Sequence, residues 1–273
     1  MRYPPCLAGL LLLAPAAPGL TQPADRALAP LHPYCASRPS LGAGACIADV
    51  GHPMLEMGIG SWERDRSDGE TTDTLLGADT VVRVGLGETT EVQFGWTAIG
   101  RERMRTPDGA VERRTRSGDV TFAVRQNLRN PDGSGFSIAV QPFVSAPVGR
   151  RPIGAGTWGA GLLVPLGYQI NDVVQLQFTG EGDAAPDEDG GGRHLAYSGI
   201  AGLALTLSDA VTTTTEVLVQ RDRDPDGHST MLLAAFSGGY QVANDSQVDA
   251  GTAIGLNAAS PDVRLFFGFS HRF

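Results

Sequence analysis

The chain ends on the stretch Val263-Arg-Leu-Phe-Phe-Gly-Phe-Ser-His-Arg-Phe273, in which every second residue belongs to one mostly apolar row. That row consists of Val263, Leu265, Phe267, Phe269, His271 and Phe273. Successive side chains of a β-strand point to opposite faces, so the pattern separates an apolar face from a mixed one. A helix could not keep the two rows apart, and we predict a β-strand that runs to the last residue.

The same period of two recurs upstream, for example in residues 91–98, 174–179 and 247–257. Twelve such stretches lie near 53–63, 74–87, 89–102, 117–128, 135–146, 156–169, 172–182, 194–207, 210–221, 229–242, 245–257 and 261–273. Strands of about ten residues suit a tilted crossing of a bilayer. We therefore predict an all-β fold, an antiparallel up-and-down transmembrane β-barrel of about 12 strands, with one lipid face and one wet face.

The connections between these stretches alternate in length. Short turns are expected at 87–89, 130–133, 171–172, 208–209 and 244–245, and longer polar links at 64–73, 103–117, 147–157, 181–193 and 222–229. Outer-membrane barrels have short periplasmic turns and longer outer loops. The alternative, a soluble secreted β-sandwich, gives no reason for that alternation.

Composition limits the function classes. The formal net charge of −9 argues against nucleic acid as a partner, because phosphate binding needs clustered positive charge. All 21 basic residues are Arg, which leaves no lysine for a Walker-type phosphate site or a Schiff base. The 36 glycines and the apolar share of 41% fit a barrel wall whose inner positions are polar or small.

The N-terminal region reads as an export signal followed by a separate segment. Residues 1–19 combine a basic start, an apolar core and small residues, and we expect a signal peptide there. We assign residues 20–51 to a periplasmic N-terminal segment and residues 52–273 to the outer-membrane β-barrel. No other stretch approaches twenty apolar residues, which excludes a helical inner-membrane protein.

Two cysteines remain once Cys6 is removed with the signal. Cys35 and Cys46 form an even pair in an exported chain, so a disulfide is the expected state. The alternative is a metal pair, but no pair of histidines lies near them. The sequence leaves open whether residues 20–51 plug the barrel.

The terminal Phe273 at the end of an amphipathic strand is typical of an outer-membrane assembly signal, which makes the barrel assembly machinery an expected partner. The alternative is that the C-terminus only completes a soluble sheet. The other expected partners are outer-membrane lipid, lipopolysaccharide and a small-molecule solute.

Three stretches carry a family resemblance. They are His52-Pro-Met-Leu-Glu56-Met-Gly58, Gln247-Val-Asp249-Ala-Gly-Thr-Ala-Ile-Gly-Leu-Asn257 and Ser260-Pro-Asp262-Val-Arg-Leu-Phe-Phe-Gly-Phe-Ser-His-Arg-Phe273. Together they resemble the "putative MetA-pathway of phenol degradation" family. The resemblance extends over most of residues 50–273 and is sharpest in the last 30. It implies a transporter-like outer-membrane barrel for a small hydrophobic or aromatic compound, and it carries over no catalytic residues.

Charges of both signs fall on the polar faces of the predicted strands. The lumen-lining candidates are Glu56, Arg83, Arg125, Glu216, Asp249 and Arg264. In a barrel of this size they could select or orient a solute, or they could pair with one another and fill the lumen. The sequence favours the second reading slightly, because opposite charges in a confined space should find partners.

No catalytic residues, metal ligands or cofactors are expected. The five histidines lie far apart without metal-ligand spacing. A lipid-modifying enzyme would need His228-Ser229 or Ser270-His271, but adjacent strand residues point to opposite faces and cannot reach each other.

Two predicted outer loops differ in charge. Residues 101–116 contain six arginines, which could bind lipopolysaccharide phosphates through paired hydrogen bonds. The acidic run at 187–189 could hold a divalent cation, but it lacks the spacing of a calcium loop. Solvated charge is the alternative for both.

These observations predict a non-enzymatic outer-membrane channel or transporter for a small solute. The alternative is a structural or adhesion barrel, with a lumen filled by side chains and with functional outer loops.

Overall fold

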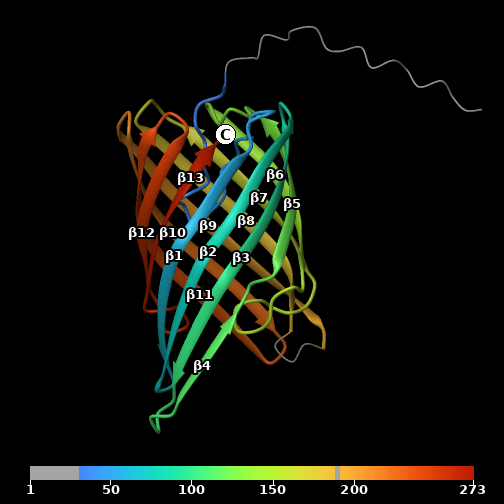
Figure 1. The fold of residues 1–273 in the computed structure, drawn as a ribbon, viewed down its shortest axis with the longest axis vertical. Coiled ribbons are helices and arrows are strands. Elements are labelled where there is room, and N and C mark those ends of the chain that lie inside the picture. The colour runs from blue at the N-terminus through green and yellow to red at the C-terminus, as the bar shows by residue number, and fades with distance from the viewer. Residues whose placement is uncertain (1–30, 188–190) are drawn as a thin grey trace, which may run out of the picture. The chain divides into compact units, whose positions relative to one another are not determined.

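The computed structural model describes residues 31–187 and 191–273. The predicted signal peptide, residues 1–19, lies outside the described residues. The chain divides into residues 1–31 and a compact unit of residues 32–273, and all the described strands belong to that second unit (Figure 1). Among the described residues, no helix is long and apolar enough to span a membrane.

The described residues form one antiparallel sheet of thirteen strands. The strands are β1 (Met54–Ser67), β2 (Glu70–Gly87), β3 (Thr90–Arg105), β4 (Val111–Arg116), β5 (Val120–Arg129), β6 (Phe136–Ala146), β7 (Gly159–Gln169), β8 (Val174–Pro186), β9 (Arg193–Ser208), β10 (Val211–Asp224), β11 (Gly227–Ala243), β12 (Ser246–Gly255) and β13 (Val263–Arg272). All twelve predicted strands are present, and their ends shift by a few residues.

The sheet closes on itself through its first and last strands. β1 pairs with β13 from Met54↔Arg272 to Arg64↔Val263, and each of the other strands of the cylinder pairs with its neighbours along the chain. Closure satisfies the backbone hydrogen bonds that an open edge would expose. The predicted closed barrel of twelve strands is confirmed, with β4 as an addition to it.

The addition is a hairpin that continues β3 beyond the barrel wall. The first half of β3 pairs with β5, from Thr90↔Gln126 to Trp96↔Val120. Its second half pairs with β4, from Gly100↔Arg116 to Arg105↔Val111, and this hairpin projects past the other strands (Figure 1). The prediction of a long loop at 103–117 is therefore wrong for most of that segment.

The connections at the two ends of the barrel differ in length, as predicted, but by less than expected. We call the end with the connections 88–89, 130–135, 170–173, 209–210 and 244–245 the turn end, and the opposite end the loop end. Two predicted long links, 64–73 and 222–229, are instead paired hairpins that reach Ser67↔Glu70 and Asp224↔Gly227. Asp68 and Gly69 both have positive φ, which allows the two-residue turn between β1 and β2.

The barrel reverses the usual distribution of polarity. Large apolar side chains on its outer face are exposed, among them Phe178, Phe236 and Phe267 at about half of their surface. The charged side chains Arg83, Glu91 and Glu216 on the inner face are at most 2% exposed. A soluble protein does not present so much apolar surface to water, whereas a bilayer solvates it. The chain is an outer-membrane β-barrel.

The apolar outer face makes a first prediction. Phe236 on β11 is 55% exposed, and an arginine there would have to enter hydrocarbon. We expect Phe236→Arg to lower the free energy of unfolding in lipid vesicles by about 2–4 kcal/mol. The control, Phe236→Leu, stays apolar and should cost much less. Urea titration followed by tryptophan fluorescence measures both, and equal stability of the two variants would contradict a lipid-facing position.

Candidate functional site

Residues 32–49, which we call the inner loop, occupy the lumen at the turn end. Hydrogen bonds join the inner loop to side chains of strands around the whole circumference: β1, β2, β3, β5, β8, β10, β12 and β13. A segment that touches all of these strands from one side can only lie inside the cylinder. The described part of the segment predicted as periplasmic therefore lies within the barrel, while the predicted domain limits stay predictions.

A disulfide between Cys35 and Cys46 closes the inner loop, as predicted. The guanidinium of Arg83 binds the backbone of both cysteines. Its Nη1 donates to the Cys35 carbonyl at 2.9 Å, and its Nη2 donates to the Cys46 carbonyl at 3.0 Å. The same guanidinium pairs with two carboxylates, Glu56 at 2.8 Å and Glu91 at 3.0 Å. Arg83 thus links β1, β2 and β3 to the two cysteines of the inner loop.

Glu91 is the second centre of this network and is fully buried. Besides Arg83, it pairs with Arg125 at 3.3 Å and accepts a hydrogen bond from the Ala48 amide at 2.6 Å. Arg125 in turn donates to the Cys46 carbonyl at 3.1 Å. Buried charges are stable only when they are paired and hydrogen-bonded, and here the backbone of the inner loop supplies part of that satisfaction.

The tip of the inner loop contacts the opposite wall. Arg38 makes two hydrogen bonds to Asp249 on β12, at 3.1 and 2.8 Å. Glu216 on β10 accepts hydrogen bonds from the Ser40 hydroxyl and from the Leu41 amide, the latter at 2.9 Å. The charge of Glu216 is therefore balanced by dipoles of the inner loop.

Two glycines of the wall make room for the inner loop. A side chain at Gly85 would lie 2.1 Å from the Ala48 carbonyl oxygen. A side chain at Gly268 would lie 2.3 Å from the Met57 carbonyl oxygen of β1 and 2.5 Å from the Arg38 guanidinium. The missing Cβ atom at Gly85 lets the backbone of the inner loop approach β2, and at Gly268 it leaves room for both β1 and the Arg38 side chain.

The end of the inner loop is fastened at the rim of the turn end. Arg272 pairs with Asp49 at 3.1 Å, and the Ile47 amide donates to the Pro131 carbonyl at 2.9 Å. In the same turn, burial alone would raise the pKa of the Asp132 carboxyl, but hydrogen bonds from the Ser134 amide and hydroxyl hold that pKa below its usual value.

Two cavities lie against the inner wall. The first, of about 310 Å³, is lined by Arg38 to Leu41 of the inner loop and by β1, β2 and β13, including Arg264 and Phe266. The second, of about 330 Å³, is lined by residues of β2, β3 and β5 to β8, including Gln93 and Phe143. Asp79 lines both cavities. Their volumes lie at the small end of the range for ligand pockets.

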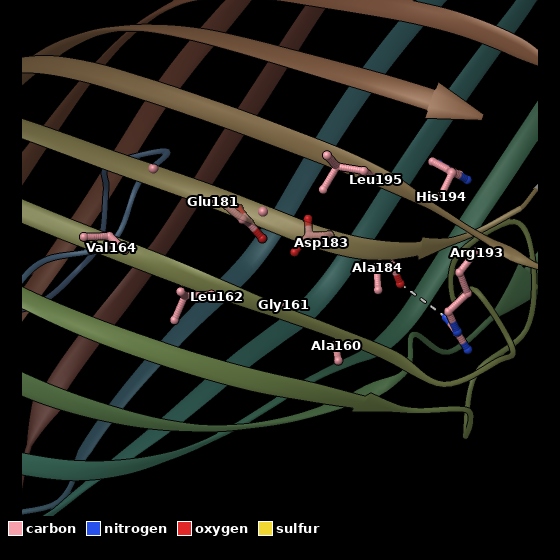
Figure 2. A pocket seen from close by; sticks show the side chains of 12 residues that line it. Ala160, Gly161, Leu162, Val164, Glu181, Asp183, Ala184, Arg193, His194 and Leu195 are labelled. Carbon is pink, nitrogen blue, oxygen red and sulfur yellow. Dashed lines mark hydrogen bonds between the residues drawn. The ribbon is translucent and has the colours of Figure 1, made fainter. Parts of the chain in front are cut away.

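A third hollow, of about 770 Å³, lies against β7, β8 and β9, and apolar atoms provide most of its lining (Figure 2). Leu162 and Leu195 flank it and are about half exposed. Three glycines line it, Gly161, Gly180 and Gly182, and the absence of their side chains contributes to the hollow. Leu162, Gly180 and Leu195 belong to the lipid-facing row, whereas Glu181, Asp183 and His194, which also line the hollow, belong to the inner row.

The outer face of the loop end carries a charged row in strand register. Arg64, Asp73, Arg103 and Arg113 are successive partners across β1, β2, β3 and β4. Trp62 and Leu75 lie on the same face, two positions along their strands from Arg64 and Asp73 toward the middle of the barrel. Leu75 is 52% exposed. The row therefore lies just beyond the apolar band of the outer surface.

The predicted lumen candidates converge on the inner loop with one exception. Glu56, Arg83, Arg125, Glu216 and Asp249 contact the inner loop directly. Arg264 instead donates to Glu63 at 2.7 Å beside the first cavity. The prediction omitted Glu91, Asn127 and Thr179, although the alternation with apolar neighbours already placed Glu91 on the polar face. No pattern in the sequence indicated that Arg38 and Asp49 would pair with charged residues of the wall.

The two Ser-His pairs considered for catalysis are placed differently. Ser270 is buried and accepts a hydrogen bond from the Tyr34 hydroxyl of the inner loop at 2.6 Å. His271 lies 2.8 Å from the Ser246 hydroxyl on the neighbouring strand. His228 and Ser229 lie in the β10–β11 hairpin, opposite Arg223 and Asp222. Neither pair brings its own serine and histidine together.

Comparison with known proteins gives one family. The model of the family described as "Putative MetA-pathway of phenol degradation" matches residues 36–273. No curated protein matches the sequence.

Solved structures resemble the barrel at low sequence identity. One described as "KdgM porin" has a TM-score of 0.49 and 9% identity, over 80% of this chain and 99% of that one. The NanC porin has a TM-score of 0.49 and 10% identity, over 82% of this chain and 100% of that one. The translocator domain of the autotransporter NalP from Neisseria meningitidis has a TM-score of 0.49 and 16% identity, over 82% and 89%. These likenesses concern the fold alone.

The buried network makes a second prediction. Arg83→Leu leaves Glu56 without its ion-pair partner and Glu91 with Arg125 alone, and we expect the free energy of unfolding to fall by about 3–5 kcal/mol. The control is Arg264→Leu, because Arg264 and Glu63 are 36% and 26% exposed and such a pair contributes about 0–1 kcal/mol. Urea titration of the refolded protein measures both. A loss in Arg264→Leu as large as in Arg83→Leu would contradict the central role of Arg83.

Proposed function

The chain belongs to the family described as "Putative MetA-pathway of phenol degradation", and we propose that it is a non-enzymatic outer-membrane channel for a small solute, with the inner loop as its gate. The observation that carries this proposal is the inner loop itself, which fills the turn end of a polar lumen through hydrogen bonds and ion pairs. The wall groups that hold the inner loop are charged or polar, so displacement of the loop would expose hydrogen-bonding groups to water and not an apolar core.

The cavities support a small solute. Each is a little over 300 Å³, which accommodates a compound the size of a single aromatic ring. Polar groups such as Gln93 and Asp79 lie there beside the rings of Phe143 and Phe266. A site with a few polar groups and aromatic walls suits a small aromatic compound that carries a hydroxyl. The family description, which names phenol degradation, points in the same direction.

The charges that hold the inner loop would line the channel once the loop is displaced. Glu56, Arg83, Arg125, Glu216 and Asp249 would then form a ring of both signs at the turn end, and Arg264 would follow further along. Such a ring disfavours neither anions nor cations strongly and selects by size and hydrogen bonding.

The alternative function is a structural or adhesion barrel. The observation in its favour is the same inner loop, because a permanently seated loop fills the turn end. In that case the outer loops would carry the structural or adhesive function. A measurement of conductance with and without the inner loop separates the two.

We propose two binding partners, one at the charged row of the loop end and one at the last strand of the barrel. Lipopolysaccharide phosphates would bind the charged row of Arg64, Arg103 and Arg113, because the row lies just beyond the apolar band and arginine pairs well with phosphate oxygens. The barrel assembly machinery would recognise the last strand, β13, together with Phe273, which follows it.

The gate makes a third prediction, tested by planar-bilayer recording. A chain that lacks residues 32–49 should give a steady current several times larger than the full chain, because the polar turn end is then open to water. Heat-modifiable migration on detergent gels serves as the control for folding of both proteins. Silence of both correctly folded proteins would contradict the channel and favour the structural barrel. Equal currents would contradict only the gate.

A fourth prediction concerns lipopolysaccharide. Arg103→Gln and Arg113→Gln should each weaken lipopolysaccharide binding by about tenfold, the loss expected for one charge-assisted hydrogen bond. The matched control is Arg129→Gln, which removes the same charge at the turn end. Binding of the refolded proteins to immobilised lipopolysaccharide measures the effect. Equal weakening by all three changes would contradict a specific row and indicate net charge alone.

A further inference from the structure

The hollow beside β7, β8 and β9 follows the outer face of β8 (Figure 2). Residues that are paired in the sheet share a face, and two sets of partners cross this surface from β7 through β8 to β9. They are Leu162↔Gly182↔Tyr197 and Val164↔Gly180↔Gly199. Each set has a glycine of β8 at its centre, so a groove runs along β8 between side chains of the two neighbouring strands. We call it the β8 groove.

The β8 groove opens toward lipid. Leu162 and Tyr197, on its two sides, are 45% and 40% exposed, and apolar atoms provide most of the lining. Glu181 and Asp183 of the inner row line the same hollow, because they alternate with the outer residues along β8 and the glycines leave the backbone beside them uncovered. The alternation directs the carboxylates of these two residues into the lumen.

The two ends of the β8 groove differ. Phe178, the next outer residue of β8 toward the turn end, is 48% exposed and bounds the groove there. From Gly180 to Ala184 the strand advances by about 13 Å, which sets the length of the groove. Beyond Ala184, at the loop end, the lining includes Arg193. The groove therefore begins at a charged border and ends on an apolar side chain.

An exposed tryptophan marks the charged border as the membrane interface. Trp158, which directly precedes β7, is 60% exposed. Arg193 donates a hydrogen bond to the hydroxyl of the preceding residue, Thr157, at 3.3 Å. Aromatic residues on the outer face of such barrels gather at the two interfaces of the bilayer. Arg193 therefore lies at the level of the lipid headgroups.

A second arginine lies beside the same border. Arg223 of β10 lies over the ring of Tyr197, 5.4 Å from its centroid, and donates to the Tyr197 hydroxyl at 3.4 Å. In the part of the chain that the structure describes, neither Arg193 nor Arg223 forms an ion pair with a carboxylate. Four other arginines of the loop end do, namely Arg64, Arg66, Arg103 and Arg114. Both guanidinium groups at the groove therefore keep hydrogen-bond donors for an external anion.

A phosphorylated lipid combines the two chemistries that this surface offers. Guanidinium groups bind phosphate oxygens through charge-assisted, often paired, hydrogen bonds, and an acyl chain suits an apolar groove. The longer connections place the loop end on the outer side of the membrane, where lipopolysaccharide forms the outer leaflet. We propose that the β8 groove binds one acyl chain of the lipid A of lipopolysaccharide, and that Arg193 and Arg223 bind one of its phosphates. This site lies on a different part of the wall from the charged row on β1 to β4.

Native mass spectrometry of the full-length refolded protein with added lipid A counts the bound lipid and tests the groove. We expect Gly182→Leu to remove one bound lipid A, because the leucine fills the groove. A Cβ atom at Gly182 meets no atom within 4 Å, so the change leaves the wall unstrained. The matched control is Gly238→Leu in the outer row of β11, where the nearest atom lies 3.7 Å from the added Cβ. The control should bind lipid A as the unchanged protein does.

The same titration tests the arginines. Arg193→Gln and Arg223→Gln should each weaken lipid A binding by about tenfold, the loss expected for one charge-assisted hydrogen bond. Arg129→Gln removes the same charge at the turn end and should have no effect. Lipid A that lacks both phosphates should bind the unchanged protein and Arg193→Gln with the same affinity, because the group that the arginine recognises is then missing.

Heat-modifiable migration shows for each variant that the barrel is folded. The proposal is overturned if the folded unchanged protein retains no lipid A, or if Gly182→Leu retains as much as Gly238→Leu. It is also overturned if phosphatidylglycerol displaces lipid A at equal concentration, which would indicate a surface for anionic lipid in general. Equal weakening by all three arginine changes would indicate net charge alone and would overturn the phosphate site. None of these variants alters the lumen or the charged row, so the groove is tested separately from both.

Discussion

The pairing of β1 with β13 is the constraint on which the rest of the barrel depends. Within hydrocarbon, each unpaired backbone group costs several kcal/mol, so a sheet can cross a bilayer only when its last strand pairs with its first strand. Closure in turn divides every strand into an outer row that must be apolar and an inner row that cannot reach lipid. The exposed phenylalanines outside and the buried arginines and carboxylates inside are two results of this one condition.

The inner row creates a second problem, which the inner loop solves. Arg83, Glu91 and Arg125 are too deeply buried to rely on bulk water, and their own ion pairs leave part of their hydrogen-bonding capacity unused. The carbonyls of Cys35 and Cys46 and the amide of Ala48 supply the remainder. The disulfide keeps the two cysteine carbonyls close enough to be held by one guanidinium. Charge inside the wall and the presence of the inner loop are therefore parts of the same arrangement.

Most of the wall could be predicted from the sequence, because a period of two is a local property of each strand. The prediction failed where strands leave the membrane: the ends of β1, β2 and β10 and the whole of β4 lack an apolar row, so they resemble loops. The lumen candidates were chosen by face, which identified Arg83 and Glu216. The position of the inner loop could not be predicted, because it rests on contacts between residues 32–49 and strands up to 240 positions away. No periodicity records such contacts.

The inner loop takes its partners from the first strand to the last. Its Tyr34 and His32 lie 236 and 240 positions before Ser270 and Arg272, which they contact. The full set of contacts of the inner loop therefore exists only when β13 has joined β1. A slip of one residue in the pairing of β1 with β13 would turn Ser270 and Arg272 to the lipid face, and the inner loop would lose both contacts. The contacts of the inner loop with β13 thus depend on the register in which the barrel closes.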